Sequence, residues 1–202
     1  MWRSPNKLFG DTRGVASLEL AIVIPIMLML LIGVYQLTQL VRVNARLSRT
    51  AVSVADLVAQ QSNGVTGGQS GSLGNFCAAA GLMMGPFPTT STTFMLSIAS
   101  VTNYSPSNIQ VDWEVDTACS NTGTHLGANA VTLVTSPPVN LLSTSGPSGS
   151  TGIAGDTVIV VQASYQYTSL LKFVAPALTT LTKTGFARPR ADAVVPCTAS
   201  CT

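Results

Sequence analysis

The chain has 202 residues, of which only 9% are charged, and its formal net charge at pH 7 is +2. This composition is unlike that of an ordinary soluble domain, which has about 25% charged residues, and it argues against a nucleic-acid binder, which needs a basic face. Two long segments, 57–111 and 117–155, carry no charged residue and are rich in Ser, Thr, Gly and Asn, as is common in exported proteins.

Residues 1–14 are short, polar and basic, and we interpret them as a cytoplasmic leader. A secretory signal peptide is also basic first and apolar second, but its apolar region is usually about 7 to 15 residues long and is followed by a small-x-small cleavage site. The apolar run of this chain is longer and offers no clear site of that kind.

The apolar run dominates the sequence, because 22 residues without a charge separate Glu19 from Arg42. A helix needs about 20 apolar residues to cross the hydrocarbon core of a bilayer, so we predict a transmembrane segment over residues 20–41. Gly14 lies five residues before Glu19. Pro25 lies inside the run and predicts a helix kink, which a membrane helix tolerates.

The flanking charges do not decide the orientation in the membrane, because three basic residues precede the apolar run and three follow it. We place the N-terminus in the cytoplasm, because the remainder of the chain has the composition of an exported domain and the first segment is too short to be a domain. The first predicted partner is therefore the membrane, which the chain crosses once. The C-terminal domain would lie in the periplasm.

The helix is expected to continue to about residue 61, because apolar residues recur at helical spacing beyond the membrane segment. Arg42, Arg46 and Arg49 fall on one face of this second half. One interpretation is a stripe that faces solvent or lipid headgroups, and the other is contact with acidic groups of neighbouring subunits. The whole helix over 15–61 would be roughly 70 Å long.

The remaining chain predicts an α+β fold in which the long helix packs on an antiparallel sheet. Residues 62–91 form a Gly/Ser loop and a connector that could include a short helix, and residues 92–202 form the exported β domain. Strands are predicted at 92–101, 108–116, 130–135, from 156, and near 184–188. In the second of them, Ile109, Val111, Trp113 and Val115 alternate with polar residues, which predicts one buried face and one exposed face.

Four cysteines, Cys77, Cys119, Cys197 and Cys201, follow the membrane segment, and an even number there fits disulfides in an oxidising compartment. Four cysteines allow three pairings. Cys197 and Cys201 are close enough in sequence for a local disulfide, in which case Cys77 and Cys119 would form the other pair.

No catalytic or metal-binding constellation is evident. Asp112, Glu114 and Asp116 share one strand face, which predicts a solvent-facing edge and not the multi-segment oxygen cage that Ca²⁺ prefers. His125 is the only histidine and falls in a Gly/Asn-rich loop. We therefore expect no enzyme activity, no cofactor, no metal, no nucleic acid and no small-molecule substrate.

The start of the apolar run resembles the processing site of type IV pilins and pseudopilins, where a membrane-embedded peptidase cuts after a glycine. The stretch with Arg13, Gly14, Glu19, Pro25 and Gly33 resembles the opening of TadE/TadG-type proteins of the tight-adherence (Tad, or Flp) pilus system. The segment 155–190, with Tyr-x-Tyr and a final Ala-Arg-Pro-Arg, resembles the closing segment of that family.

The resemblance implies cleavage between Gly14 and Val15 by a prepilin peptidase, and partnership with other pilins and Tad assembly components. Cleavage would create an ammonium group at Val15. A carboxylate in or near lipid is costly unless paired, so the Glu19 carboxylate could pair with the Val15 ammonium of a neighbouring subunit. The chain would be a minor pilin or pseudopilin in the bacterial inner membrane or in an extracellular pilus. The alternative is an uncleaved, single-span envelope protein that presents its β domain for adhesion or scaffolding.

Overall fold

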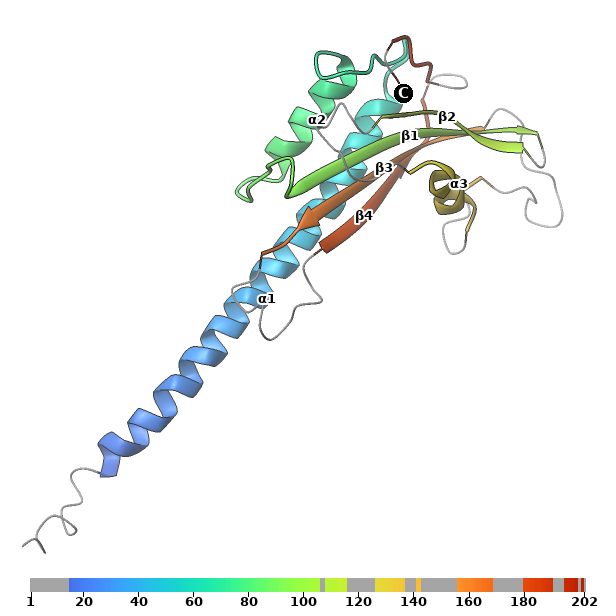
Figure 1. The fold of residues 1–202 in the computed structure, drawn as a ribbon. Coiled ribbons are helices and arrows are strands. Elements are labelled where there is room, and N and C mark those ends of the chain that lie inside the picture. Colours follow the sequence, from blue (N-terminus) through green and yellow to red (C-terminus); the bar gives the residue numbers. More distant parts are fainter. Residues whose placement is uncertain are drawn as a thin grey trace, which may run out of the picture.

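The computed structural model describes residues 15–105, 108–115, 126–136, 141–142, 156–168, 180–190, 195–199 and 201. Over these residues, one very long helix carries a head that contains two short helices and a four-stranded sheet (Figure 1). The elements in chain order are α1 (Val15–Ala59), α2 (Ser72–Met83), β1 (Phe94–Ser105), β2 (Asn108–Val115), α3 (Ala128–Thr135), β3 (Asp156–Gln166) and β4 (Thr180–Ala187). The predicted α+β fold is confirmed.

The sheet has the strand order β2-β1-β3-β4, and each neighbouring pair is antiparallel. The two central strands are the most apolar. In β3, residues 157–161 are all buried, so this strand is covered on both faces at its N-terminal end. A strand with both faces buried loses the simple alternation of apolar and polar residues.

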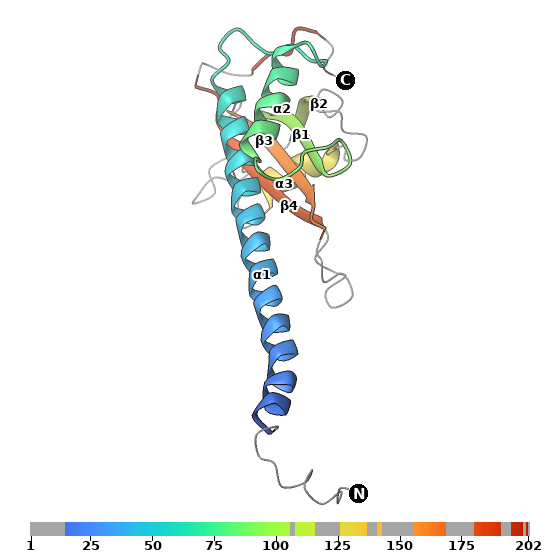
Figure 2. The same ribbon diagram turned by 90° about the vertical axis from the view of Figure 1, so that its left-hand side faces the viewer.

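The second half of α1 covers one face of the sheet, and α2 packs beside α1 in the same core (Figure 2). The helix contributes a stripe of nearly inaccessible side chains at helical spacing: Val43, Leu47, Ala51, Val54, Ala55, Val58 and Ala59. Gly185 of β4 permits very close approach, because a Cβ atom there would overlap the backbone of Ala51 and Val52. The absence of a side chain at this position thus sets the distance between helix and sheet.

α3 covers the opposite face of the sheet and builds a second, smaller core. Ala130 and Val134 of α3 pack there against Val101 of β1 and Val158 and Val160 of β3. The strand predicted at 130–135 is therefore wrong. Its β-branched residues favour a strand locally, but the helical spacing of Ala130 and Val134 lets both contact the sheet, and this tertiary packing outweighs the local preference.

The predicted faces of β2 are also wrong, because a β-bulge interrupts the strand. Ser100 pairs with Trp113 and Val101 pairs with Val111, so Asp112 is the extra residue. A bulge changes the side on which the following residues lie. Ile109 and Val111 accordingly pack on the α3 side, whereas Trp113 and Val115 pack on the α1 side.

The other elements differ from the predictions mainly in their bounds. β1 begins two residues later than expected and extends to Ser105, and β4 begins at Thr180. The connector contains α2. Gly14, Asp116, Cys119 and His125, and the apolar stretch 170–178, lie outside the described residues.

Candidate functional site: the assembly helix

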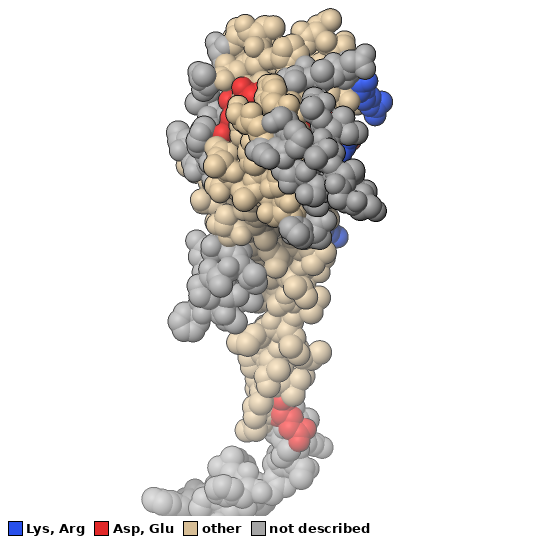
Figure 3. All heavy atoms as spheres, turned by 90° about the vertical axis from the view of Figure 1, so that its right-hand side faces the viewer, with Lys and Arg blue, Asp and Glu red and all other residues tan. Residues whose placement is uncertain are grey.

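The first half of α1 projects from the head with its side chains open to the surroundings. No described residue in the range 17–35 is buried, and the large apolar side chains there are between 41% and 72% exposed. The most apolar window has a mean hydropathy of 2.5 and is 0% buried, so by length and composition this helix can cross a membrane. On the face shown in Figure 3, uncharged side chains cover this projecting part and acidic atoms appear only near its end.

Glu19 is the fifth residue of α1 and its side chain is exposed. Val15, the first residue that the structure describes, is already helical. The helix continues without interruption through Pro25, so the backbone hydrogen bond lost at the proline does not end the helix. The kink stays a prediction.

Burial against the head begins at Gln36, which is 9% exposed although it belongs to the predicted membrane segment 20–41. The phenol of Tyr167, just beyond the end of β3, donates a hydrogen bond to Oε1 of Gln36 at 2.9 Å. Burial raises the pKa of Tyr167, and the nearby phenol of Tyr35 raises it further. Tyr167 thus reaches α1 at Gln36, the residue next to Tyr35.

Sequence reasoning missed this junction, although two signals were present. Gln36, Thr38 and Gln39 place three polar residues within four positions, immediately after an unbroken apolar stretch. The hydroxyl of Thr38 donates to the carbonyl oxygen of Val34 at 2.8 Å, which satisfies that hydroxyl within the helix. Gln36 has no such local partner, and the head supplies one.

Residues 14–56 match the family model described as TadE-like protein. The helical segment is thus similar to TadE-like proteins. The predicted resemblance is confirmed over this range, which begins at Gly14 and ends three residues before α1 does. It does not include the sheet, so the resemblance of the closing segment stays a prediction. No curated protein and no solved structure matches the chain.

The three arginines of the TadE-like segment, Arg42, Arg46 and Arg49, are exposed along one face, as expected from their spacing. One of them also has a role within the head that was not predicted. The Arg46 guanidinium donates to the carbonyl oxygens of Met83, at 3.3 Å, and Gly85. A cation at this position satisfies carbonyl groups at the C-terminus of α2 and interacts favourably with its dipole.

The acidic residues of β2 hold the head together and do not form a solvent-facing edge, so that prediction is wrong. Asp112 accepts hydrogen bonds from Ser100, Thr102 and Tyr104, the last at 2.6 Å, and this contact raises the pKa of Tyr104. Glu114 is 8% exposed and accepts from the backbone N–H groups of Leu126 and Gly127. Its carboxylate therefore serves as an acceptor just before α3, where helical N–H groups lack partners.

Within the part of the chain that the structure describes, no group of three or more His, Cys, Asp and Glu side chains could hold a metal ion. The acidic residues of β2 are separated by the bulge onto opposite faces. Each carboxylate is already engaged by donors of the protein, which is what a structural role requires.

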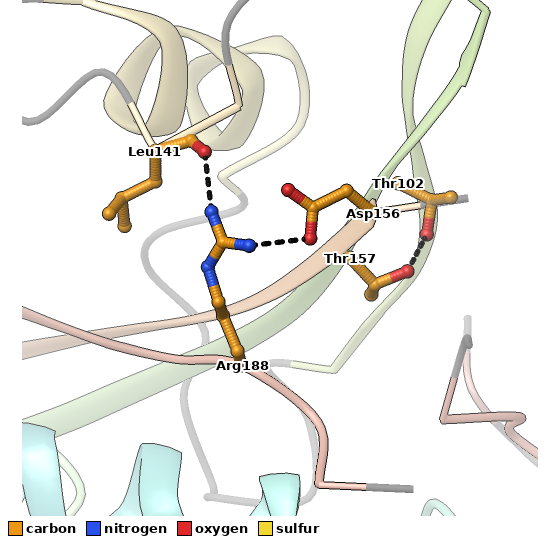
Figure 4. Close-up of polar contacts among 5 residues, drawn as sticks. All are labelled: Thr102, Leu141, Asp156, Thr157 and Arg188. Atoms are coloured by element: carbon orange, nitrogen blue, oxygen red, sulfur yellow. Dashed lines mark hydrogen bonds and ion pairs between the residues drawn. The ribbon is translucent and has the colours of Figure 1, made fainter. Parts of the chain in front are cut away.

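Arg188, in the closing segment, ties β4 to two neighbouring parts of the head (Figure 4). Its guanidinium donates to Asp156 at 2.8 Å, at the start of β3, and to the carbonyl oxygen of Leu141 at 2.9 Å. The hydroxyls of Thr102 and Thr157 lie 2.8 Å apart beside this ion pair. The arginine is therefore a positioning residue for the α3 side of the sheet.

The C-terminal tail docks on the loop that follows α1. Val65 and Cys197 form a parallel bridge, supported by backbone hydrogen bonds from Val65 to Pro196 at 2.8 Å and from Thr198 to Val65 at 2.9 Å. A disulfide joins Cys197 to Cys201, and Cys77 is also disulfide-bonded. Trp113 donates to the carbonyl oxygen of Val195 at 2.7 Å, so the predicted core position of this tryptophan also anchors the tail.

Proposed function

We propose that this protein is a minor pilin or pseudopilin that takes part in the assembly of a Tad (Flp) type IV-like adhesive pilus. The observation that carries the proposal is the TadE-like match, which starts at Gly14 and covers an apolar helix whose described first-half side chains are exposed. An apolar surface of this extent needs lipid or other helices around it. A pilus subunit has both, first in the membrane and then in the fibre.

The proposed processing step is hydrolysis of the peptide bond between Gly14 and Val15 by a prepilin peptidase. Water adds across the bond, which leaves a carboxylate on Gly14 and an ammonium group on Val15. A glycine before the bond lets the backbone extend into a peptidase site. Because Val15 is already helical, the mature chain would start within the helix.

Glu19 would then fix the register between subunits. Its carboxylate is exposed near the end of the projecting helix, and the described side chains from Leu20 onwards along that half are apolar. Pairing with the Val15 ammonium of a neighbouring subunit would remove the cost of an unpaired charge near lipid. Apolar contact between helices would supply the remaining lateral packing, and the exported head would contact other pilus components.

The first test is the mass of the N-terminal peptide from cells with and without the prepilin peptidase. Processing predicts a mature chain that begins at Val15 only when the peptidase is present. A Gly14→Val variant should retain residues 1–14 in both strains. Recovery of the unmodified chain with these residues attached in peptidase-competent cells would contradict processing and favour the uncleaved, membrane-anchored alternative.

The second test is a Glu19→Ala variant, with Leu18→Ala as the matched control on the adjacent position. Both variants should insert into the membrane, because neither removes a long part of the apolar run. Only Glu19→Ala should reduce the number of pili per cell in electron micrographs, and Glu19→Asp should restore part of it. Normal piliation in the Glu19→Ala strain would remove the pairing role.

A further inference from the structure

We infer that the outer surface of the bilayer crosses the protein at Tyr35, Gln36 and Tyr167, so that the base of the sheet lies on lipid headgroups. This rests on the proposed function only in that α1 is taken as a membrane helix. This position of the bilayer surface moves the outer end of the membrane segment from residue 41, which the sequence predicts, to residue 35. The interaction surface is therefore the junction of α1 with the end of β3, and its partner is a phospholipid surface.

The burial pattern of α1 is the first argument. The described side chains from 18 to 32 are all exposed, whereas Gln36 is 9% exposed and is hydrogen-bonded to Tyr167, just beyond the end of β3. If residues 36–41 were in the hydrocarbon core, Tyr167 and the end of β3 would be there as well. Strand ends carry backbone groups that need water or polar partners, and lipid offers none.

The chemistry of the junction is the second argument. Residues 20–35 contain no polar side chain except the Tyr35 phenol, and Gln36, Thr38 and Gln39 follow at once. Tyrosines are enriched where a membrane protein passes from hydrocarbon to water. Tyr167 binds Gln36, the residue next to Tyr35, so both phenols belong to this level. Arg42 lies six residues after Gln36, about 9 Å higher on the helix, where its side chain can reach lipid phosphates.

The consequence for the other end of the helix follows from its length. A hydrocarbon core of about 30 Å takes about 20 residues, so a segment that ends at Tyr35 begins near Ala16. Glu19 then lies inside the inner edge of the core, whereas a segment over 20–41 leaves it outside. At that depth an unpaired carboxylate is costly, so Glu19 would require a partner there that it would not require at the interface.

Cysteine accessibility tests the inference with three positions on one face of α1. Leu31, Thr38 and Ala45 are seven residues apart and all exposed. The full chain carrying Leu31→Cys, Thr38→Cys or Ala45→Cys is reconstituted in sealed vesicles of phosphatidylethanolamine and phosphatidylglycerol and treated with a membrane-impermeant maleimide. The chain without an added cysteine gives the background, and labelling in sodium dodecyl sulfate gives the maximum.

A surface at Gln36 predicts that Thr38→Cys reacts as fast as Ala45→Cys, and that Leu31→Cys reacts at least about tenfold more slowly, because a thiolate does not form in hydrocarbon. Protection of both Leu31→Cys and Thr38→Cys would overturn the inference and restore the segment 20–41, while leaving the pilin proposal intact. Fast labelling of all three would overturn the inference together with the membrane span itself.

A tryptophan reporter tests the same surface from the side of the sheet. In vesicles with lipids brominated near the headgroup, the emission of Tyr167→Trp should be quenched at least about twofold relative to vesicles without bromine, as expected for an interfacial ring. Tyr104→Trp, near the opposite end of the long central strand β1, should be unaffected. Equal emission of Tyr167→Trp in both kinds of vesicle would contradict contact between the base of the sheet and lipid.

Discussion

The two halves of α1 belong to one unbroken helix and yet differ in the burial of their side chains. Residues 18–32 are exposed on every side, whereas the half from Val43 to Ala59 buries a stripe against the sheet and leaves its arginines outside. The backbone is the same in both halves, so the difference lies entirely in what surrounds the side chains. The comparison teaches that the upper half is stabilised by the head, whereas the lower half is exposed and has the length and composition of a helix that can cross a membrane.

The same substitution at a buried position of the upper half and at an exposed position just below it should give the largest contrast. Leu47 is 0% exposed and Leu37 is 63% exposed. Leu47→Ala removes buried contacts and leaves a cavity, so we expect a loss of about 3 kcal/mol in the free energy of unfolding of the head in detergent. Urea titration followed by the fluorescence of buried Trp113 measures it. Leu37→Ala should leave the midpoint nearly unchanged, and equal effects would contradict the division of the helix.

Two glycines offer the next contrast. A Cβ at Gly185 would meet the backbone of α1, whereas nothing lies within 4 Å of a Cβ at Gly33. Gly185→Val should therefore force the sheet away from the helix and cost about 2 kcal/mol, in the range of overpacked cores. Gly33→Ala should not lower the thermal midpoint of the head in detergent. If Gly185→Val melts like the parent chain, the close approach of β4 to α1 is not needed.

The junction between the halves should give the smallest effect. Tyr167→Phe removes the hydrogen bond to Gln36, which is worth about 1 kcal/mol. We expect faster hydrogen exchange of the α1 amides around residues 35–40, measured by mass spectrometry in nanodiscs. Tyr104→Phe is the matched control, because it removes a phenol hydrogen bond in the head, to Asp112. Unchanged exchange in Tyr167→Phe would show that the helix is held there by apolar packing alone.

The fold class, the long helix and the inner strand β3 could be predicted from the sequence, because each depends on a pattern that local composition fixes. The apolar run is longer than a strand or turn of a soluble protein. Along β3, apolar residues alternate with other residues over the full length of the strand, at Ile159, Val161, Ala163 and Tyr165. The cover of this face by the second half of α1 followed from the same periodicity.

The bulge, α3 and the junction at Gln36 could not be predicted, because each depends on a distant partner. One extra residue at Asp112 redistributes the apolar side chains of β2 between two cores. α3 depends on that redistribution, since Glu114 then lies on the α3 side of the sheet and accepts from the N–H groups of Leu126 and Gly127, just before α3. Gln36 appeared to belong to the membrane segment because its partner, Tyr167, is far away in the sequence.

The bulge in β2 also affects whether neighbouring copies of the head can pair through their edge strands. β2 is the last strand at one side of the sheet, so its outer backbone groups face away from β1. Heads held at one height above a membrane would present these outer strands to one another, and an even ladder invites strand addition and amyloid-like stacking. The extra residue at Asp112 twists and interrupts that ladder. In an assembly of many subunits, such a bulge would keep neighbouring heads from pairing strand to strand into a continuous intermolecular sheet.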